Sequence, residues 1–159
     1  NTPPAPLPIA EVKSPSQPTF SPDGTRLAFT DSGSGSIGDL IVVEIDGSHE
    51  WRLEGGTGPV WSPDSKMLAI RTHGGDGAGT WTVRADGTHK THLPQASWAG
   101  LSWSPDSHYL AYAGGEGHLS NGDIFAIHPD GTNRVRLVHR QGPYGLPLWK
   151  HGTATTEAG

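Results

Sequence analysis

One five-residue pattern occurs three times in this chain, each time followed by the same succession of residues. The pattern is an aromatic residue, then Ser-Pro-Asp, then Gly or Ser. It begins at Phe20, Trp61 and Trp103, which are 41 and 42 positions apart. An apolar triplet follows each copy, then a Gly-rich loop, an Asp-Gly turn and a short stretch with a late Leu. Self-similarity at a nearly fixed spacing is the signature of a repeat architecture.

The chemistry of each repeat predicts four short antiparallel strands. Ser-Pro-Asp-Gly/Ser predicts a tight turn after the first strand, because Pro presets φ and Asp bonds back to nearby amides. The apolar triplets at Leu27, Leu68 and Leu110 predict the second strands, and residues 40–45, 81–84 and 124–127 predict the third. Asp-Gly, the strongest short hairpin signal, leads into the fourth. A four-stranded unit of about 40–45 residues is typical of a propeller blade.

Composition excludes several other classes of protein. The 159 residues include 23 Gly and 14 Pro, which weaken helix interiors, while six Trp supply core material. The net charge is −5 and the 11 basic residues are scattered, so no nucleic-acid partner is expected. No apolar run approaches the length of a membrane span. The absence of Cys excludes disulfides and thiolate metal sites.

The repeat as a whole, Trp-Ser-Pro-Asp-(Gly/Ser)-x-x-Leu-Ala followed by Asp-Gly and a late Leu, resembles the TolB-like repeat, also called the WD40-like or PD40 repeat. The resemblance extends over residues 18–137. This repeat also occurs in propellers attached to tricorn-type and prolyl-oligopeptidase-type peptidases and in oligogalacturonate lyases. The resemblance implies an all-β fold of three four-stranded antiparallel propeller blades and a periplasmic or secreted location. The chain departs from the family in holding three repeats where six or seven are usual, and in lacking TolB's amino-terminal α/β domain.

The repeats divide the chain into five parts. We predict a Pro-rich arm at 1–17, blade 1 at 18–57, blade 2 at 58–98 and blade 3 at 99–141. Residues 142–159 hold a partial fourth repeat, with Trp149 as its aromatic residue, and a tail. Residues 8–13 of the arm are candidates for an extra outer strand on a neighbouring blade.

Three blades do not close a ring, since closed propellers have roughly 4–8. Open blade faces would leave large apolar patches in water. A homodimer solves this problem, because two copies related by twofold symmetry give a six-bladed ring with equivalent joints. The alternative is that the chain is a fragment of a longer propeller.

Two conspicuous features are interpreted as structural. The repeated aspartates, first in the Ser-Pro-Asp turns and then in the Asp-Gly turns, are needed by every blade and are expected to bind turn amides. Gly33 to Gly38 match GxGxxG, but a dinucleotide site needs a strand before the motif and a helix after it, and here a strand follows.

Functional candidates are the loop residues that do not repeat, because loops on a rigid scaffold carry function. Two sets are predicted. The ligand-binding candidates are His73, Trp98, Glu116 and His118. The metal candidates are Asp31, Asp39, Asp76 and Asp123, whose oxygens suit Ca²⁺; no other cofactor is expected.

The function predicted from these features is a non-enzymatic binding module. Its loop face or channel would hold a protein, peptide or glycan. No GxSxG, HExxH or P-loop motif occurs. The alternative is part of a propeller-type hydrolase or polysaccharide lyase with its site at the ring centre, where His73 and His118 would be the leading candidates.

Overall fold

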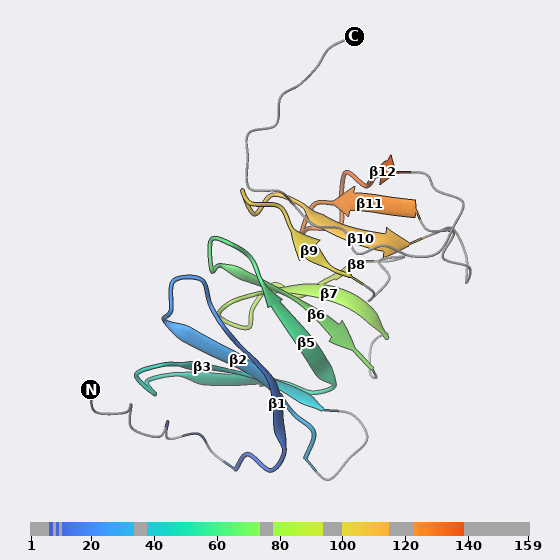
Figure 1. The fold of residues 1–159 in the computed structure, drawn as a ribbon. Coiled ribbons are helices and arrows are strands. Elements are labelled where there is room, and N and C mark those ends of the chain that lie inside the picture. The colour runs from blue at the N-terminus through green and yellow to red at the C-terminus, as the bar shows by residue number, and fades with distance from the viewer. Residues whose placement is uncertain are drawn as a thin grey trace.

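The computed structural model describes residues 7, 9, 11–33, 38–73, 78–93, 100–114 and 123–138. Every helix or strand assigned in these residues is a β-strand, and the strands form three four-stranded antiparallel sheets. Figure 1 shows the three sheets following one another as a row. The predicted all-β fold of three four-stranded blades is confirmed. Nothing in the described ranges is a helix long and apolar enough to cross a membrane.

Each blade is a simple meander, in which strands adjacent in sequence are adjacent in the sheet. Blade 1 contains β1 (Pro15–Phe20), β2 (Arg26–Asp31), β3 (Asp39–Glu44) and β4 (Glu50–Leu53). Blade 2 contains β5 (Gly56–Trp61), β6 (Met67–Thr72), β7 (Gly79–Arg84) and β8 (Thr91–Leu93). Blade 3 contains β9 (Ser102–Trp103), β10 (Leu110–Gly114), β11 (Asp123–Ile127) and β12 (Val135–Val138). Residues 15–17, assigned to the arm from the sequence, are part of β1.

The Ser-Pro-Asp turn is built in the same way in all three blades. In blade 1, Ser21 Oγ donates to Asp23 Oδ1 (2.6 Å) and accepts from Arg26 N (2.9 Å). The same contacts join Ser62 to Asp64 and Met67, and Ser104 to Asp106 and Tyr109. The prediction that these repeated aspartates are structural is confirmed.

The Asp-Gly turns also repeat their hydrogen bonds. Asp46 Oδ1 accepts from Ser48 N at 2.8 Å, and Gly47 has φ +74°. Only glycine adopts such a φ readily. Equivalent bonds join Asp86 to Thr88 and Asp130 to Thr132. These aspartates are likewise structural, as the repetition predicted.

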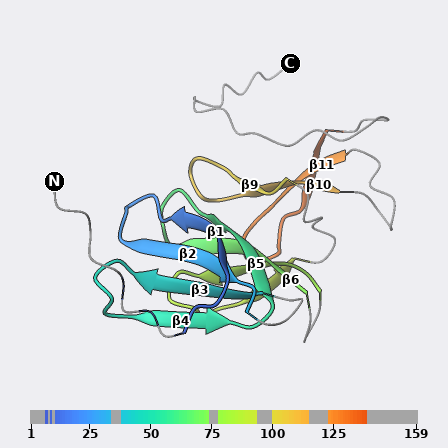
Figure 2. The ribbon, with the colours of Figure 1, turned by 60° about the horizontal axis from the view of Figure 1, so that its bottom comes forward.

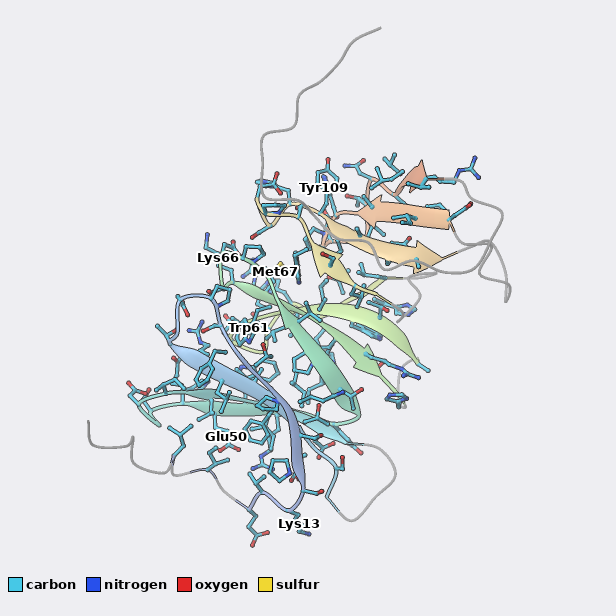
Figure 3. All side chains as sticks on the ribbon, viewed as in Figure 1. Lys13, Glu50, Trp61, Lys66, Met67 and Tyr109 are labelled. Carbon is cyan, nitrogen blue, oxygen red and sulfur yellow. The ribbon has the colours of Figure 1, made fainter. Side chains whose placement is uncertain are left out.

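Successive blades are joined through the aromatic residue that ends the first strand of each, here called the anchor. The indole Nε1 of Trp61 donates to Thr19 O of blade 1 (3.2 Å), and that of Trp103 donates to Val60 O of blade 2 (3.0 Å). Both indoles are buried, and Figure 3 shows Trp61 between the first two sheets. The acceptor in each case directly precedes the anchor of the preceding blade.

A second contact repeats at both joints. Ser65 Oγ accepts from Asp23 N, and Ser107 Oγ accepts from Asp64 N, both at 3.0 Å. Each serine stands four positions after its anchor, at the end of its own Ser-Pro-Asp-Ser turn. Blades 2 and 3 are therefore each hydrogen-bonded to the turn of the blade before them.

Apolar packing completes the joints. One buried cluster combines side chains of blades 1 and 2, and a second combines blades 2 and 3. The first cluster contains Ala28, Leu40, Val42, Trp61, Leu68, Ile70, Val83 and Ala85. The second contains Ala69, Leu93, Trp103, Leu110, Tyr112, Phe125 and Ile127. The core thus lies between blades.

A third cluster lies on the far side of blade 1, away from blade 2. Phe29, Ile41 and Val43 are buried there, and Leu7, Ile9 and Val12 of the N-terminal arm pack against them. Figure 2 shows the coloured part of the arm, which leads into β1, beside blade 1. The arm residues that are described cover a face of their own blade and form no outer strand, in contrast to the sequence expectation. The reason is that this face is apolar and that no blade precedes it in the described residues.

Candidate functional site

The predicted site residues that the structure describes lie at one end of the sheets, here called the loop face. Asp31 ends β2, Asp39 begins β3, His73 follows β6 and Asp123 begins β11. Asp31 and Asp39 face each other across the β2–β3 ladder. Asp39 and Asp123 occupy equivalent register positions, where blade 2 has Gly79. The loop face therefore carries carboxylates in blades 1 and 3.

Asp31 holds the end of the arm. Its carboxylate accepts from Lys13 N (3.2 Å), Ser14 N (2.6 Å) and Gly33 N (3.4 Å), and its side chain is buried. These backbone donors, Ser14 N foremost, hold the pKa of Asp31 below its ordinary value. Figure 3 shows Lys13 where the arm enters β1. The arrangement fixes the point at which the arm turns into the first blade.

The other two described aspartates also bind the chain itself. Asp39 Oδ1 accepts from Gly55 N (3.1 Å), in the connection from β4 to β5. Asp123 is buried and lies 3.5 Å from Arg136 Nη1 of β12. Across the described ranges, no three His, Asp or Glu side chains gather as a metal cluster would require. The calcium site stays a prediction, since it also involves Asp76.

His73 is half-buried, and its backbone N donates to Gly55 O at 3.2 Å. This contact brings the end of β6 next to the connection between blades 1 and 2. Four further candidates lie outside the described residues: Asp76, Trp98, Glu116 and His118. Most of the glycine-rich 33–38 segment lies outside them as well. The structure thus places His73 on the loop face and leaves its predicted ligand-binding neighbours as predictions.

A second candidate site, which the loop prediction missed, is formed by the two ends of the blade row. All five exposed large apolar side chains in the described part of the chain lie there: Phe20, Ile45, Val135, Leu137 and Val138. Phe20 is 62% exposed, whereas the anchors Trp61 and Trp103 are 7% and 6% exposed. Large exposed apolar patches mark interaction surfaces.

Register equivalence explains why these residues are exposed. Ile45 corresponds to Ala85, which is buried against blade 1, and Val138 corresponds to Leu93, which is buried against blade 3. In the described residues no blade precedes blade 1 or follows blade 3. Ile45 and Val138 therefore occupy joint positions that lack a neighbouring blade in the described residues.

The sequence carried a signal for the first of these ends. Phe20 stands where the other anchors are Trp, and Gly24 stands where the others have Ser65 and Ser107. Phe has no indole N–H to donate, and Gly has no hydroxyl to accept. The first repeat thus lacks both side chains that, in the later repeats, form hydrogen bonds with the preceding blade.

The fold and the repeated joints define the described part of the chain as a row of β-propeller blades. No family model matches the chain. A TolB homolog from Chlorobium luteolum is 31% identical over 123 residues, covering 75% of this chain and 27% of that protein. The repeats therefore belong to the TolB-like β-propeller repeat family, as the resemblance predicted.

Solved structures share the fold. The propeller domain of the Trilobed protease from Pyrococcus furiosus, described as having an open velcro topology, aligns with a TM-score of 0.62 and 16% identity. That alignment covers 79% of this chain and 42% of the propeller chain. TolB from Acinetobacter baumannii aligns at 0.61 and 23% identity, covering 79% of this chain and 32% of that one. The chain thus spans about a quarter of its curated relative and less than half of these two propeller chains.

Proposed function

We propose that this chain is a non-enzymatic binding scaffold whose two open ends join those of a second copy to close a six-bladed ring. The observation that carries the proposal is the position of four exposed apolar side chains at both ends of the row, which correspond in register to residues at the internal joints: Phe20, Ile45, Val135 and Val138. Covering such surfaces is the main source of free energy in protein association.

The internal joint between blades 1 and 2 supports the fit between the two ends. Trp51 of β4 donates its Nε1 to Ala85 O (2.9 Å), and its ring packs against Gly87. Val135 has the same register position in blade 3 as Trp51 has in blade 1. In a ring of two copies, Val135 would meet Ile45 and Gly47 of the other copy, and exposed apolar surface would cover exposed apolar surface.

The closed ring would present its loop face to a ligand. His73, Trp98, Glu116 and His118 would then line this face or the channel and bind a protein, peptide or glycan. A periplasmic or secreted location is proposed with this function, on the basis of TolB-like repeats. The uses of Asp31 and Asp39 in binding the chain's own backbone favour scaffold roles for these two residues.

Multi-angle light scattering across a concentration series tests the proposal. We expect a species of twice the chain's mass, and we expect Val135→Asp to convert it to a monomer by placing a charge in the joint. Lys90→Asp, at an exposed position between β7 and β8 of blade 2, is the control and should leave the dimer intact. A folded monomer at every concentration would contradict ring closure by a second copy and would favour the alternative that the chain is part of a longer propeller.

The second candidate function is part of a propeller-type hydrolase or polysaccharide lyase. The similarity to the propeller domain of a protease is the observation that favours it. Incubation of the purified chain with casein and with polygalacturonate tests it. Turnover that disappears in both His73→Ala and His118→Ala would support the enzyme, while absence of turnover in the closed ring would leave the binding scaffold.

A further inference from the structure

The face of blade 1 that would receive a second copy is already partly occupied. This leading face consists of Leu27, Phe29, Ile41 and Val43, with Phe20 and Ile45 at its margin. The residues at the same register positions in blade 2 are Leu68, Ile70, Trp81 and Val83, which belong to the cluster shared with blade 1. On blade 1 the arm takes the place of a blade, through Leu7, Ile9 and Val12.

The arm covers only part of what a blade covers. Phe29, Ile41 and Val43 are buried beneath it, while Phe20 and Ile45 stay exposed. An internal joint buries the anchor and adds the tryptophan and serine hydrogen bonds described above. Three aliphatic side chains of an arm therefore replace a complete blade-to-blade contact, and a blade can make contacts on this face that the arm does not.

The arm is nevertheless specifically held. Its last residues are bound by the Asp31 carboxylate through Lys13 N and Ser14 N. Ile9 N donates to Leu7 O at 2.8 Å, so the arm is bent tightly between two of its apolar contacts. These contacts hold the arm against its own blade.

We infer that the arm and the third blade of a second copy bind the leading face alternately, so that the arm limits self-association. This inference rests on the proposed ring closure and adds its regulation. If the leading face can bind a second copy only in molecules whose arm has left, the apparent affinity of the dimer is reduced in proportion to the fraction of such molecules. Release of the arm should therefore tighten the dimer.

The test compares the full-length chain with its Ile9→Asp/Val12→Asp variant by sedimentation equilibrium. Two charges on the apolar side of the arm should release it from the face. We expect the apparent dimer dissociation constant to fall by about tenfold or more, as for a competent state that is initially populated at 10% or less. Glu11→Ala, an exposed arm position between the two, is the matched control and should leave the constant unchanged.

A synthetic peptide of residues 1–14 provides a second measurement on the released variant. It should restore the weaker association, whereas the same peptide carrying Ile9→Asp and Val12→Asp should not. Near-ultraviolet circular dichroism of the buried tryptophans checks that the variant is folded. If the variant does not fold, the same peptide pair added to the wild-type dimer replaces the comparison, and only the wild-type sequence should dissociate it.

The outcomes separate the two proposals. A wild-type dimer with the same dissociation constant in the arm variant, and no effect of the peptide, would overturn the arm's role and leave ring closure standing. Folded monomers in both proteins at all concentrations would overturn ring closure itself. A variant that dimerises more tightly and responds to the peptide supports both.

Discussion

The joint between blades 1 and 2 and the leading face of blade 1 are built on the same turn, but they differ in the two side chains that hydrogen-bond to a preceding blade. Both have a Ser-Pro-Asp turn with the same internal hydrogen bonds. At the joint, Trp61 donates to blade 1 and Ser65 accepts from it. At the leading face the corresponding residues are Phe20 and Gly24, which do neither. The turn therefore stabilises the blade to which it belongs, while the anchor and the residue four positions later attach that blade to the one before it.

The backbone of the turn reinforces this lesson. Ser65 and Ser107 have φ values of +62° and +63°, a conformation that costs non-glycine residues about 1–2 kcal/mol. Gly24 adopts φ +73° without that cost. The chain therefore accepts backbone strain at the two turns where a hydroxyl has a neighbouring blade to bind, and glycine occupies the turn where the described chain has no such neighbour.

The anchors provide the largest test of this comparison. Trp61→Ala should lower the free energy of unfolding by about 3–5 kcal/mol, because it removes a buried aromatic side chain from the joint. Phe20→Ala in the monomer should cost less than about 0.5 kcal/mol, because its side chain is mostly in water. Urea denaturation of the two variants measures both. Similar losses of unfolding free energy in the two variants would contradict the conclusion that the anchor stabilises a blade only where another blade covers it.

Acid should weaken turns in all three blades. Hydrogen bonds, first from Ser21 Oγ, lower the pKa of Asp23 to about 2, and those from Thr88 and Thr132 lower the pKa of Asp86 and Asp130. A folded pKa below the unfolded value contributes stability above the unfolded pKa and loses it as pH falls. The melting temperature should therefore drop between about pH 4 and pH 2. Asp23→Asn should reduce this dependence; an unchanged pH profile in that variant would contradict the turn's role.

The serines at the joints should show a smaller effect. Ser65→Ala should cost about 1 kcal/mol, the typical net value of one hydrogen bond. Ser65→Gly removes the same bond but relieves the positive φ, so its net change should be close to zero. Chemical denaturation of the pair separates the two contributions. Equal losses in both variants would show that the hydroxyl and not the backbone conformation decides the balance.

The last test copies the joint residues onto the leading face. Phe20→Trp/Gly24→Ser should lower monomer stability by about 1–2 kcal/mol, because serine carries the backbone strain at this positive φ while the described chain offers its hydroxyl no blade to bind. It should tighten self-association by up to roughly tenfold for each hydrogen bond gained at a joint. Sedimentation equilibrium measures this effect, with Phe20→Trp/Gly24→Ala as the control without a hydroxyl. Unchanged affinity would indicate that a second copy meets blade 1 in another geometry.

The sequence was sufficient to predict the turns and the strand order within each repeat. The turn aspartates such as Asp64 and the strand order depend on contacts a few residues apart, and three parallel copies made these contacts visible. The arm was different, because Leu7, Ile9 and Val12 have no regular period that would indicate the face they cover. Asp31 was predicted as a metal candidate, but its partners at Lys13 and Ser14 are 18 and 17 positions away and become evident only after folding.

The exposed ends of the blade row could be predicted from the sequence only in part. Phe20 and Gly24 depart visibly from the repeat, yet the departure has meaning only once Trp61 and Ser65 are seen to reach across to another blade. The remaining loop candidates, among them Trp98 and His118, come from segments where the copies differ most in length and composition. Repetition gives no information there, so their roles stay predictions.

The cross-blade bonds of the anchors and serines have a direction, because each blade carries the side chains that bind the one before it. A repeat duplicated after blade 3 would bring its own means of attachment and need no matching change in blade 3. A repeat inserted ahead of blade 1 would lack these hydrogen bonds, because blade 1 has Phe20 and Gly24 where the later blades have Trp and Ser. Growth of such a protein by gene duplication is therefore easier at one terminus than at the other, and a designer extending the row should build from the C-terminal side.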